Sequence, residues 1–182
     1  GMAVSVTYTL ESGYGSAITV EGGGFLLNNE MGDFNAGPGL TNDQGLIGTV
    51  PNLARPEQRM LSSMSPSIVA KDGELVAVVG SPGGRTIINT VLQVILNVVE
   101  FGMNMQQAVE IPRINHGGGL SVTVEPGINE EVLAQLEAWG HELRRRTTRG
   151  GVGGAQGIMF NILTGVMIGG STPHKDGMAV AY

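Results

Sequence analysis

The strongest periodic pattern in the chain is helical and lies near its middle. Between residues 85 and 101, apolar residues recur every three or four positions, at Ile88, Val91, Leu92, Ile95, Val98 and Val99. Gly102 follows directly, and glycine commonly ends a helix because it adopts left-handed dihedral angles without strain. We predict a helix here that packs on a sheet, and two shorter helices at residues 104–110 and 129–139.

Alternation with a period of two predicts strands elsewhere. Residues 3–10 put hydroxyl side chains on one face and apolar side chains on the other, so we predict a half-buried strand. Asp72-Gly73 separates two apolar runs, and an Asp-Gly pair marks a hairpin turn. The predicted strands beside this turn and later in the chain cover residues 17–20, 24–27, 67–70, 75–79, 121–125, 142–147, 156–161, 166–168 and 178–181. Strand pairs joined by tight turns, with helices packed outside them, predict an α+β fold.

One long segment, residues 28–59, shows neither pattern. It is polar and rich in glycine, proline and asparagine, and long irregular loops in compact proteins are usually functional. A chain of 182 residues is long enough to form a stable core, and we predict a single domain over residues 1–182.

The chain carries little charge. Charged residues make up 14% of it, against about 25% in a typical globular protein, which points to a large interface with a partner. The alternative is that the 30 glycines dilute the charge without implying any partner. The net charge of −6 argues against binding nucleic acid or an anionic membrane. Polar residues interrupt the apolar run at residues 87–99, so we predict no membrane span there.

Several kinds of site are disfavoured by composition. The chain has no cysteine, which excludes disulfides, thiolate metal sites and a cysteine nucleophile. His116, His141 and His174 lack metal-ligand spacing, so we expect neither a metal ion nor another cofactor.

Candidate chemistry gathers around a glycine turn. Gly83-Gly84 stands directly before the long predicted helix, where unpaired N–H groups face outward and no side chain blocks a reacting carbonyl oxygen. This arrangement is typical of an oxyanion hole in acyl transfer. Ser62-Ser63 form a hydroxyl pair in a loop, while Glu30 and Asp33, after a predicted strand, either bind an amino group or cap a helix.

In their order along the chain, these segments resemble the small subunit of γ-glutamyltranspeptidases. The resemblance spans essentially the whole chain and rests on residues 6–10, 26–31, 33–34, 61–66, 80–84 and 112–113. The family belongs to the N-terminal nucleophile hydrolases, which implies part of an αββα sandwich, here lacking its first strand, and a heterodimer made by autoprocessing of a precursor. The implied reaction is transfer or hydrolysis of γ-glutamyl groups from glutathione or related amides, through an acyl-enzyme.

The resemblance also implies roles for individual residues. It implies that Gly83 and Gly84 supply the oxyanion-hole amides, and that Thr9 is a second threonine hydrogen-bonded to the N-terminal nucleophile. Glu11, Glu30 and Asp33 are implied to bind the donor, the last two through its α-amino group. The implied carboxylate site is Ser62 and Ser63, with an arginine of the large subunit, which is the expected partner.

Three positions depart from the family pattern. Glu11 stands where asparagine is frequent, and Gln44, in a lid loop expected at residues 41–48, stands where some members have an aromatic residue. Thr172-Pro173-His174 replaces the more usual Asp-Pro-Arg. The nucleophilic threonine belongs about a dozen residues before Ala3, so we expect this chain alone to be inactive.

Two alternatives stay open. One is an acylase of the same superfamily that acts on another amide, and the other is a non-catalytic remnant or a partner-binding fragment. Retention of Glu30, Asp33, Ser62 and Ser63 argues against another acylase. Export to the periplasm or the medium is expected for a bacterial member of the family.

Overall fold

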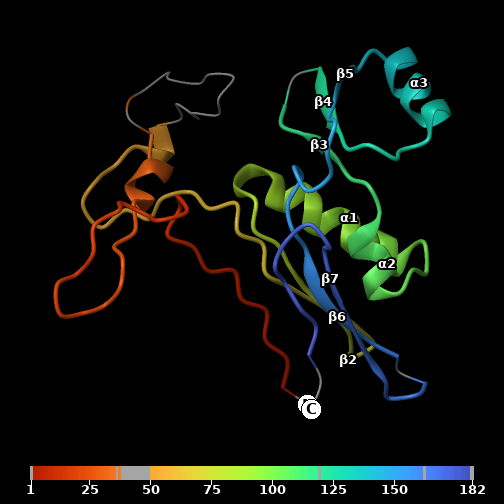
Figure 1. Ribbon diagram of the computed structural model, residues 1–182, viewed down its shortest axis with the longest axis horizontal. Coiled ribbons are helices and arrows are strands. Elements are labelled where there is room, and N and C mark those ends of the chain that lie inside the picture. The colour runs from red at the N-terminus through yellow and green to blue at the C-terminus, as the bar shows by residue number, and fades with distance from the viewer. Residues whose placement is uncertain (1, 36, 38–49, 119, 162, 181–182) are drawn as a thin grey trace. The chain divides into compact units, whose positions relative to one another are not determined.

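A computed structural model describes residues 2–35, 37, 50–118, 120–161 and 163–180 (Figure 1). The chain divides into two compact units, which are described separately. The sheet unit comprises Gly1–Thr7 and Ser63–Tyr182, and the loop unit comprises Tyr8–Ser62. The expected lid at residues 41–48, with Gln44, lies outside the described residues.

An antiparallel sheet of four strands, in the order β1-β2-β6-β7, forms the centre of the sheet unit. The predicted hairpin is confirmed as β1 (Ser67–Lys71) and β2 (Glu74–Gly80). Its turn residues Asp72 and Gly73 both have positive φ, 53° and 85°, as a tight two-residue hairpin turn requires. The strands β6 (Gln156–Phe160) and β7 (Met167–Ser171) complete the sheet.

Two helices supply most of the core against this sheet. The long helix predicted at residues 85–101 is a 3-10 turn, η3 (Gly84–Thr86), followed by α1 (Ile87–Val99). The helix α2 (Met105–Glu110) starts with a capping box, in which Asn104 Oδ1 accepts from the Gln107 N–H at 2.9 Å. Figure 1 shows α2 beside β7 and β6, while α1 contacts α2 and β2. The buried side chains that join helices and sheet include Ala77, Val79, Ile87, Val91, Val94, Val98, Met105, Ala108, Val109 and Ala155.

Glycines allow α2 to approach the sheet closely. A Cβ on Gly157 would lie 2.5 Å from the Met105 sulfur, and one on Gly170 would lie 2.8 Å from the Met105 backbone. At these two positions α2 lies directly against the strands, with no room for a side chain in place of the glycine.

A second, three-stranded sheet has the order β3-β4-β5. Its strands are β3 (Ile114–His116), which the sequence pattern did not predict, β4 (Ser121–Val124) and β5 (Glu142–Arg145). The helix α3 (Glu130–Ala138) connects the parallel strands β4 and β5. The small core of this part comprises Val122, Val124 and Leu133. With helices and mainly antiparallel strands in the described residues, the predicted α+β class is confirmed.

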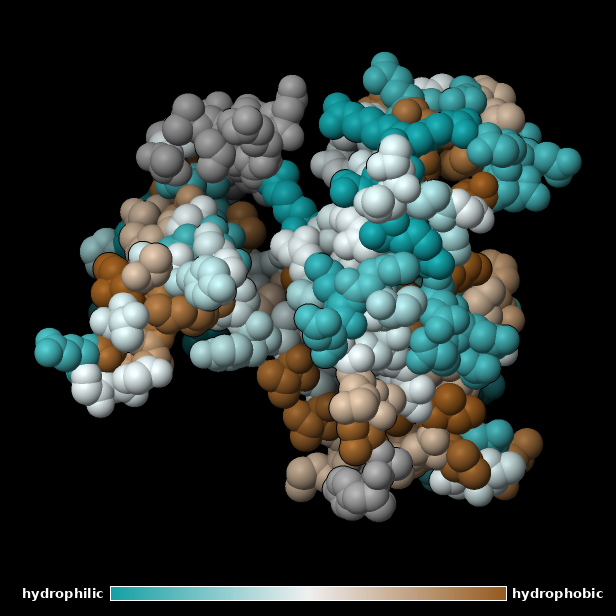
Figure 2. Space-filling model, in the orientation of Figure 1, coloured by the Kyte–Doolittle hydropathy of each residue, from teal (hydrophilic) through white to brown (hydrophobic). Residues whose placement is uncertain are grey.

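The strand predicted at residues 3–10 was wrong, because the described residues offer it no ladder. The alternation itself persists, yet the hydroxyl side is the covered one: Ser5 Oγ donates to the Val79 carbonyl at 2.9 Å. The apolar side chains of Val4, Val6 and Tyr8 are 66%, 72% and 84% exposed. Exposed hydrophobic side chains are spread over both units in Figure 2. A strand needs backbone hydrogen bonds to a neighbour as well as a pattern.

Other predicted strands at the two ends of the chain also fall short. Residues 17–20 and 24–27 meet in one antiparallel bridge, Thr19 with Leu26, rather than forming full strands. Residues 178–180 carry no strand in the structure. Both segments lack a long neighbour with which to extend a ladder.

Candidate active site

The Gly83-Gly84 turn links the sheet to the first helix of the sheet unit. The strand β2 ends at Gly80, and η3 begins at Gly84, so three residues, Ser81, Pro82 and Gly83, make the connection. Gly83 and Gly84 have φ of 139° and 54°, in the region that favours glycine. A Cβ on Gly83 would lie 2.5 Å from Thr86 Oγ1 and 3.0 Å from the Gly153 Cα. Only glycine fits at residue 83 without displacing backbone.

The N–H groups of this turn are available to a ligand. Thr86 already uses its N–H and its hydroxyl, which both donate to the Gly83 carbonyl, at 3.1 Å and 2.9 Å. Among the residues that the structure describes, none accepts a hydrogen bond from the N–H of Gly83 or Gly84. Both glycines are exposed. Exposed backbone donors at the start of a helix are suited to stabilising a developing negative charge.

Ser63 contacts the turn through its side chain. Its Oγ donates to the Gly84 carbonyl at 2.8 Å. A relay of serines follows: Ser65 Oγ donates to the Ser63 carbonyl, and Ser67 Oγ donates to the Ser65 carbonyl, each at 3.0 Å. The hydroxyl of Ser63 thus binds a carbonyl group of the turn and does not occupy the N–H groups of Gly83 and Gly84.

The acidic residues meet within the loop unit. Glu30 and Asp33 are the two ends of a 3-10 turn, η1 (Glu30–Asp33). Glu11 faces the same turn, since a Cβ on Gly32 would lie 2.6 Å from Glu11 Oε1. We call Glu11, Glu30 and Asp33 the acidic cluster. Partial burial, and then the charges of Asp33 and Glu11, raise the pKa of Glu30 above its ordinary value. Three carboxylates so placed favour a cation such as an ammonium group.

Two asparagines, Asn28 and Asn29, stand directly before η1. The N-cap residue Asn29 makes no side-chain cap and instead bonds Ser12, accepting from its N–H at 3.1 Å and donating to its Oγ at 3.0 Å. Asn28 Oδ1 accepts from the Glu30 N–H at 3.1 Å. These bonds shape the loop and leave the carboxylates of Glu30 and Asp33 to other partners.

Thr9 and Glu11 form a tight local turn. The Glu11 N–H donates to Thr9 Oγ1 at 2.8 Å, and Glu11 has a φ of 72°, which a non-glycine residue rarely adopts. Residues in such conformations are concentrated at functional sites. Thr9 is exposed, as is Ser62.

The structure thus brings the predicted residues together in two groups. Gly83, Gly84 and Ser63 meet in the sheet unit. Thr9 meets Glu11, and Glu11 meets the Glu30–Asp33 turn, in the loop unit. Ser62 is the last residue of the loop unit, directly before Ser63.

One polar residue of the loop unit was missed by the sequence analysis. Asn52, 7% exposed and part of η2 (Val50–Asn52), donates through Nδ2 to the Asp33 carbonyl at 2.7 Å and to Asn35 Oδ1 at 3.2 Å. Its Oδ1 accepts from the Leu61 N–H at 2.8 Å. Asn52 therefore ties the end of the acidic turn to the segment that leads into Ser62. A lone asparagine in a polar loop gives no sequence signal for this role.

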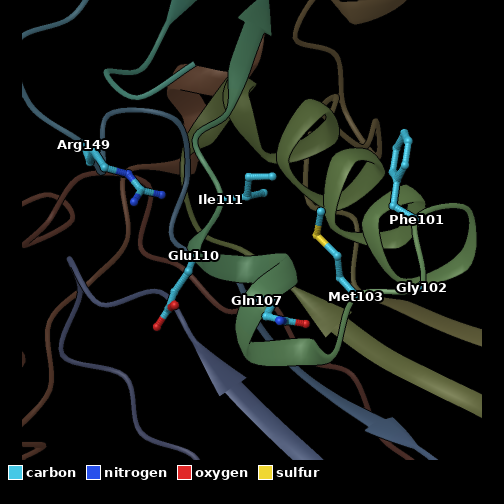
Figure 3. A pocket seen from close by; sticks show the side chains of 7 residues that line it. All are labelled: Phe101, Gly102, Met103, Gln107, Glu110, Ile111 and Arg149. Carbon is cyan, nitrogen blue, oxygen red and sulfur yellow. The ribbon is translucent and has the colours of Figure 1, made fainter. Parts of the chain in front are cut away.

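A pocket of about 570 Å³ lies elsewhere on the sheet unit, beside α2 (Figure 3). It is lined by Phe101, Gly102, Met103, Gln107, Glu110, Ile111 and Arg149, and none of these is a predicted site residue. No group of three metal-ligating side chains occurs within the described ranges. No helix described by the structure is long and apolar enough to cross a membrane.

Comparison with known proteins decides the family. The sequence profile described as gamma-glutamyltranspeptidase matches residues 1–182. The chain belongs to the γ-glutamyltranspeptidase family. It is 41% identical to the glutathione hydrolase proenzyme of Escherichia coli over 184 residues, covering all of this chain and 31% of that protein.

Solved structures show that the fold is shared as well. The γ-glutamyltranspeptidase of Helicobacter pylori superposes with a TM-score of 0.87 at 42% identity, covering 96% of this chain and 95% of that one. The chain therefore has the fold of this family of N-terminal nucleophile hydrolases. A relative with another name, the acylase ACY 1 proenzyme of a Pseudomonas strain, is 33% identical over all of this chain and 30% of that protein.

The chain spans less than a third of the curated relatives it matches. These relatives are proenzymes by name, so the family is one of processed precursors, and its members include glutathione hydrolases and acylases. A chain of this extent corresponds to part of such a precursor.

Proposed function

We propose that this chain is the donor-recognition and oxyanion-stabilising part of an enzyme that transfers or hydrolyses γ-glutamyl groups, with glutathione or a related amide as donor. The observation that carries the proposal is the Gly83-Gly84 turn. Its two N–H groups are exposed and donate to no acceptor among the described residues. Free backbone donors on a rigid turn are the chemical requirement for stabilising a tetrahedral oxyanion.

The reaction needs a nucleophile, which in this proposal is the threonine expected at the start of the small subunit. A threonine at the N-terminus of the processed small subunit attacks the γ-carbonyl carbon of the donor, and the carbonyl oxygen takes up negative charge against the N–H groups of Gly83 and Gly84. The amine leaves with a proton, and an acyl-enzyme remains. Water or an acceptor amine then takes the γ-glutamyl group and restores the threonine. Thr9 is the second threonine, which hydrogen-bonds the nucleophile.

The donor is held by its α-amino and α-carboxylate groups. Glu30 and Asp33 bind the ammonium, and Glu11 adds a third acid nearby, which suits a cation. Ser62 and Ser63 bind the carboxylate together with an arginine from the large subunit. In this proposal the two units of the chain belong to a single domain, and the partner is the large subunit of the same precursor.

The acylase relative supports a second candidate, cleavage of an amide other than a γ-glutamyl amide. The acidic cluster distinguishes the two candidate functions. A donor without an ammonium group leaves the negative charges of the acidic cluster uncompensated. The test compares γ-glutamyl-p-nitroanilide with glutaryl-p-nitroanilide, which keeps a carboxylate and lacks the amine, on the complete processed protein.

We expect the γ-glutamyl anilide to have a kcat/KM at least about a hundredfold higher, because one charge-assisted hydrogen bond already accounts for roughly tenfold. An Asp33→Asn enzyme should lose most of this preference. Equal rates on both anilides would support the acylase, and no turnover of either would support a non-catalytic remnant.

A further inference from the structure

Two charged side chains lie almost completely inside the sheet unit. Arg113 is 1% exposed and Glu125 is 2% exposed, and no other charged residue within the described ranges is buried to this degree. Burying a charge is unfavourable unless hydrogen bonds compensate for the lost water. The hydrogen-bond partners of Arg113 and Glu125 therefore show which segment the two side chains fix in place.

Both side chains bind the backbone of residues 150–154, which we call the glycine loop. Glu125 Oε1 accepts from the N–H groups of Gly150 and Val152, at 2.8 Å and 3.2 Å, and Oε2 accepts from the Arg113 N–H at 3.1 Å. Arg113 Nε donates to the Val152 carbonyl and Nη1 to the Val109 carbonyl, each at 2.8 Å. The carboxylate thus holds the N–H groups of the loop while the guanidinium holds its carbonyl.

Burial lowers the pKa of Arg113 from its ordinary value, and the charge of Glu125 opposes this change. The arginine stays charged, since its ordinary pKa is far above neutral pH. Each buried charge therefore depends on the other and on the loop between them. Removing either charge takes away part of the compensation of the other, which keeps its own hydrogen bonds to the backbone.

The glycine loop in turn packs under the Gly83-Gly84 turn. The Gly154 N–H donates to Ser81 Oγ at 3.1 Å, and Ser81 Oγ donates to the Pro82 carbonyl at 2.7 Å. The Gly153 Cα lies 3.0 Å from the position of a Cβ on Gly83, so the two backbones are in direct contact. A Cβ on Gly153 would itself lie 2.8 Å from Ser81 Oγ. The space admits no side chain on either side.

We propose that Arg113 and Glu125 are positioning residues for the oxyanion-hole turn, acting through the glycine loop and Ser81. Arg113 and Glu125 fix the glycine loop through their hydrogen bonds. The glycine loop contacts Ser81 and Gly83, and this contact restricts the orientation of the N–H groups of Gly83 and Gly84. The catalytic consequence rests on the proposed function, whereas the mechanical coupling holds for this chain by itself.

The coupling is tested by amide hydrogen exchange and NMR on the chain as it stands. In Glu125→Gln we expect exchange at Gly150 and Val152 to become at least about tenfold faster and the amide signals of Gly83 and Gly84 to shift, because the coupled segment opens locally. Ser81→Ala, a small uncharged change, should shift the same turn signals. Val98→Ala, at the far end of α1, removes core packing without touching the loop and serves as the control.

Turn signals that stay unchanged while the loop loosens would overturn the proposal. The same holds for turn signals that move equally in Val98→Ala, because general destabilisation would then explain the effect.

The catalytic consequence is tested in the complete processed protein with γ-glutamyl-p-nitroanilide. The oxyanion exists only in the transition state, so Ser81→Ala and Glu125→Gln should lower kcat by about tenfold to a hundredfold while KM stays within about twofold. Val98→Ala should leave both constants near their original values. A raised KM with kcat preserved would overturn the assignment. An inactive complete protein would refute the proposed function, and the exchange measurement then decides the coupling alone.

Discussion

The glycine turn and the acidic cluster hold functional groups in opposite ways. The Gly83-Gly84 turn offers backbone N–H groups. It is fixed between β2 and α1, by Ser63 and by the glycine loop. The acidic cluster offers side-chain charges in the loop unit, two of them on the four-residue 3-10 turn η1 and the third at Glu11. Backbone donors on rigid elements suit a charge that exists only in the transition state. Clustered carboxylates suit the binding of a ground-state cation.

This difference predicts how changes in each region act on catalysis. Changes near the glycine turn should act on kcat, and changes near the acidic cluster should act on KM.

Neither region should work without the nucleophile. We expect the isolated chain to release p-nitroaniline from the γ-glutamyl anilide only at the background rate, because an oxyanion hole and a binding site by themselves form no acyl-enzyme. Repurified chain is assayed at high concentration. Turnover that persists and disappears in Thr9→Ala would contradict this, and would make Thr9 the nucleophile.

The charge of Asp33 should matter for donor affinity in the complete enzyme. Asp33→Asn keeps the shape and removes the charge, and a charge-assisted hydrogen bond contributes about 1.5 to 3 kcal/mol. We expect KM for the γ-glutamyl donor to rise by roughly tenfold to a hundredfold, with a smaller change in kcat.

Autoprocessing of Asp33→Asn should be largely unaffected, since the cleavage site of the precursor carries no free ammonium. Gel analysis of processing is the control for correct folding. Unchanged donor kinetics in a fully processed variant would refute the amino-group site.

Asn52 should support the acidic cluster without contacting the donor. Its amide links the Asp33 carbonyl to the Leu61 N–H, so Asn52→Ala leaves buried polar groups unpaired, at a cost of about 1 to 3 kcal/mol. We expect a lower unfolding temperature and a severalfold increase in KM, with kcat little changed. Gln58→Ala, which removes exposed hydrogen bonds of the same unit, is the matched control. A fall in kcat alone would contradict the division between the two regions.

The pH dependence of stability gives the smallest effect. The pKa of Glu30 is raised above its ordinary value of 4.5 in the folded chain. The folded chain therefore favours the protonated carboxyl, and this contribution to stability is present below pH 4.5 and is lost as the pH rises through the raised pKa. Glu30→Gln should therefore raise the unfolding temperature at pH 7 relative to the original chain, and this gain should vanish near pH 4. The donor should bind more weakly.

Thermal unfolding of both chains at the two pH values measures this effect. Glu21→Gln, an exposed acid of the same unit, is the control and should give no such gain. A gain at pH 7 that is equal for both variants would show a general charge effect rather than strain in the acidic cluster.

Local pattern predicted much of the sheet unit correctly. The Asp72-Gly73 hairpin, the long helix before Gly102 and the Gly83-Gly84 turn all follow from residues close together in the chain. Such elements depend on turn conformations and side-chain periodicity, which a short sequence window contains. The candidate residues of both regions were named from short motifs in their order along the chain, and their roles stay predictions.

Tertiary structure decided the features that depend on distant partners. Residues 3–10 have a strand's alternation but no ladder, and β3 forms without a visible pattern because β4 pairs with it. The sequence gives no sign that Arg113, Glu125 and Asn52 bind distant segments of backbone. Their roles come from bonds to backbone as far as 39 residues away, as in the bond from Arg113 to Val152. Burial makes such bonds necessary, and only the folded chain determines which groups are buried together.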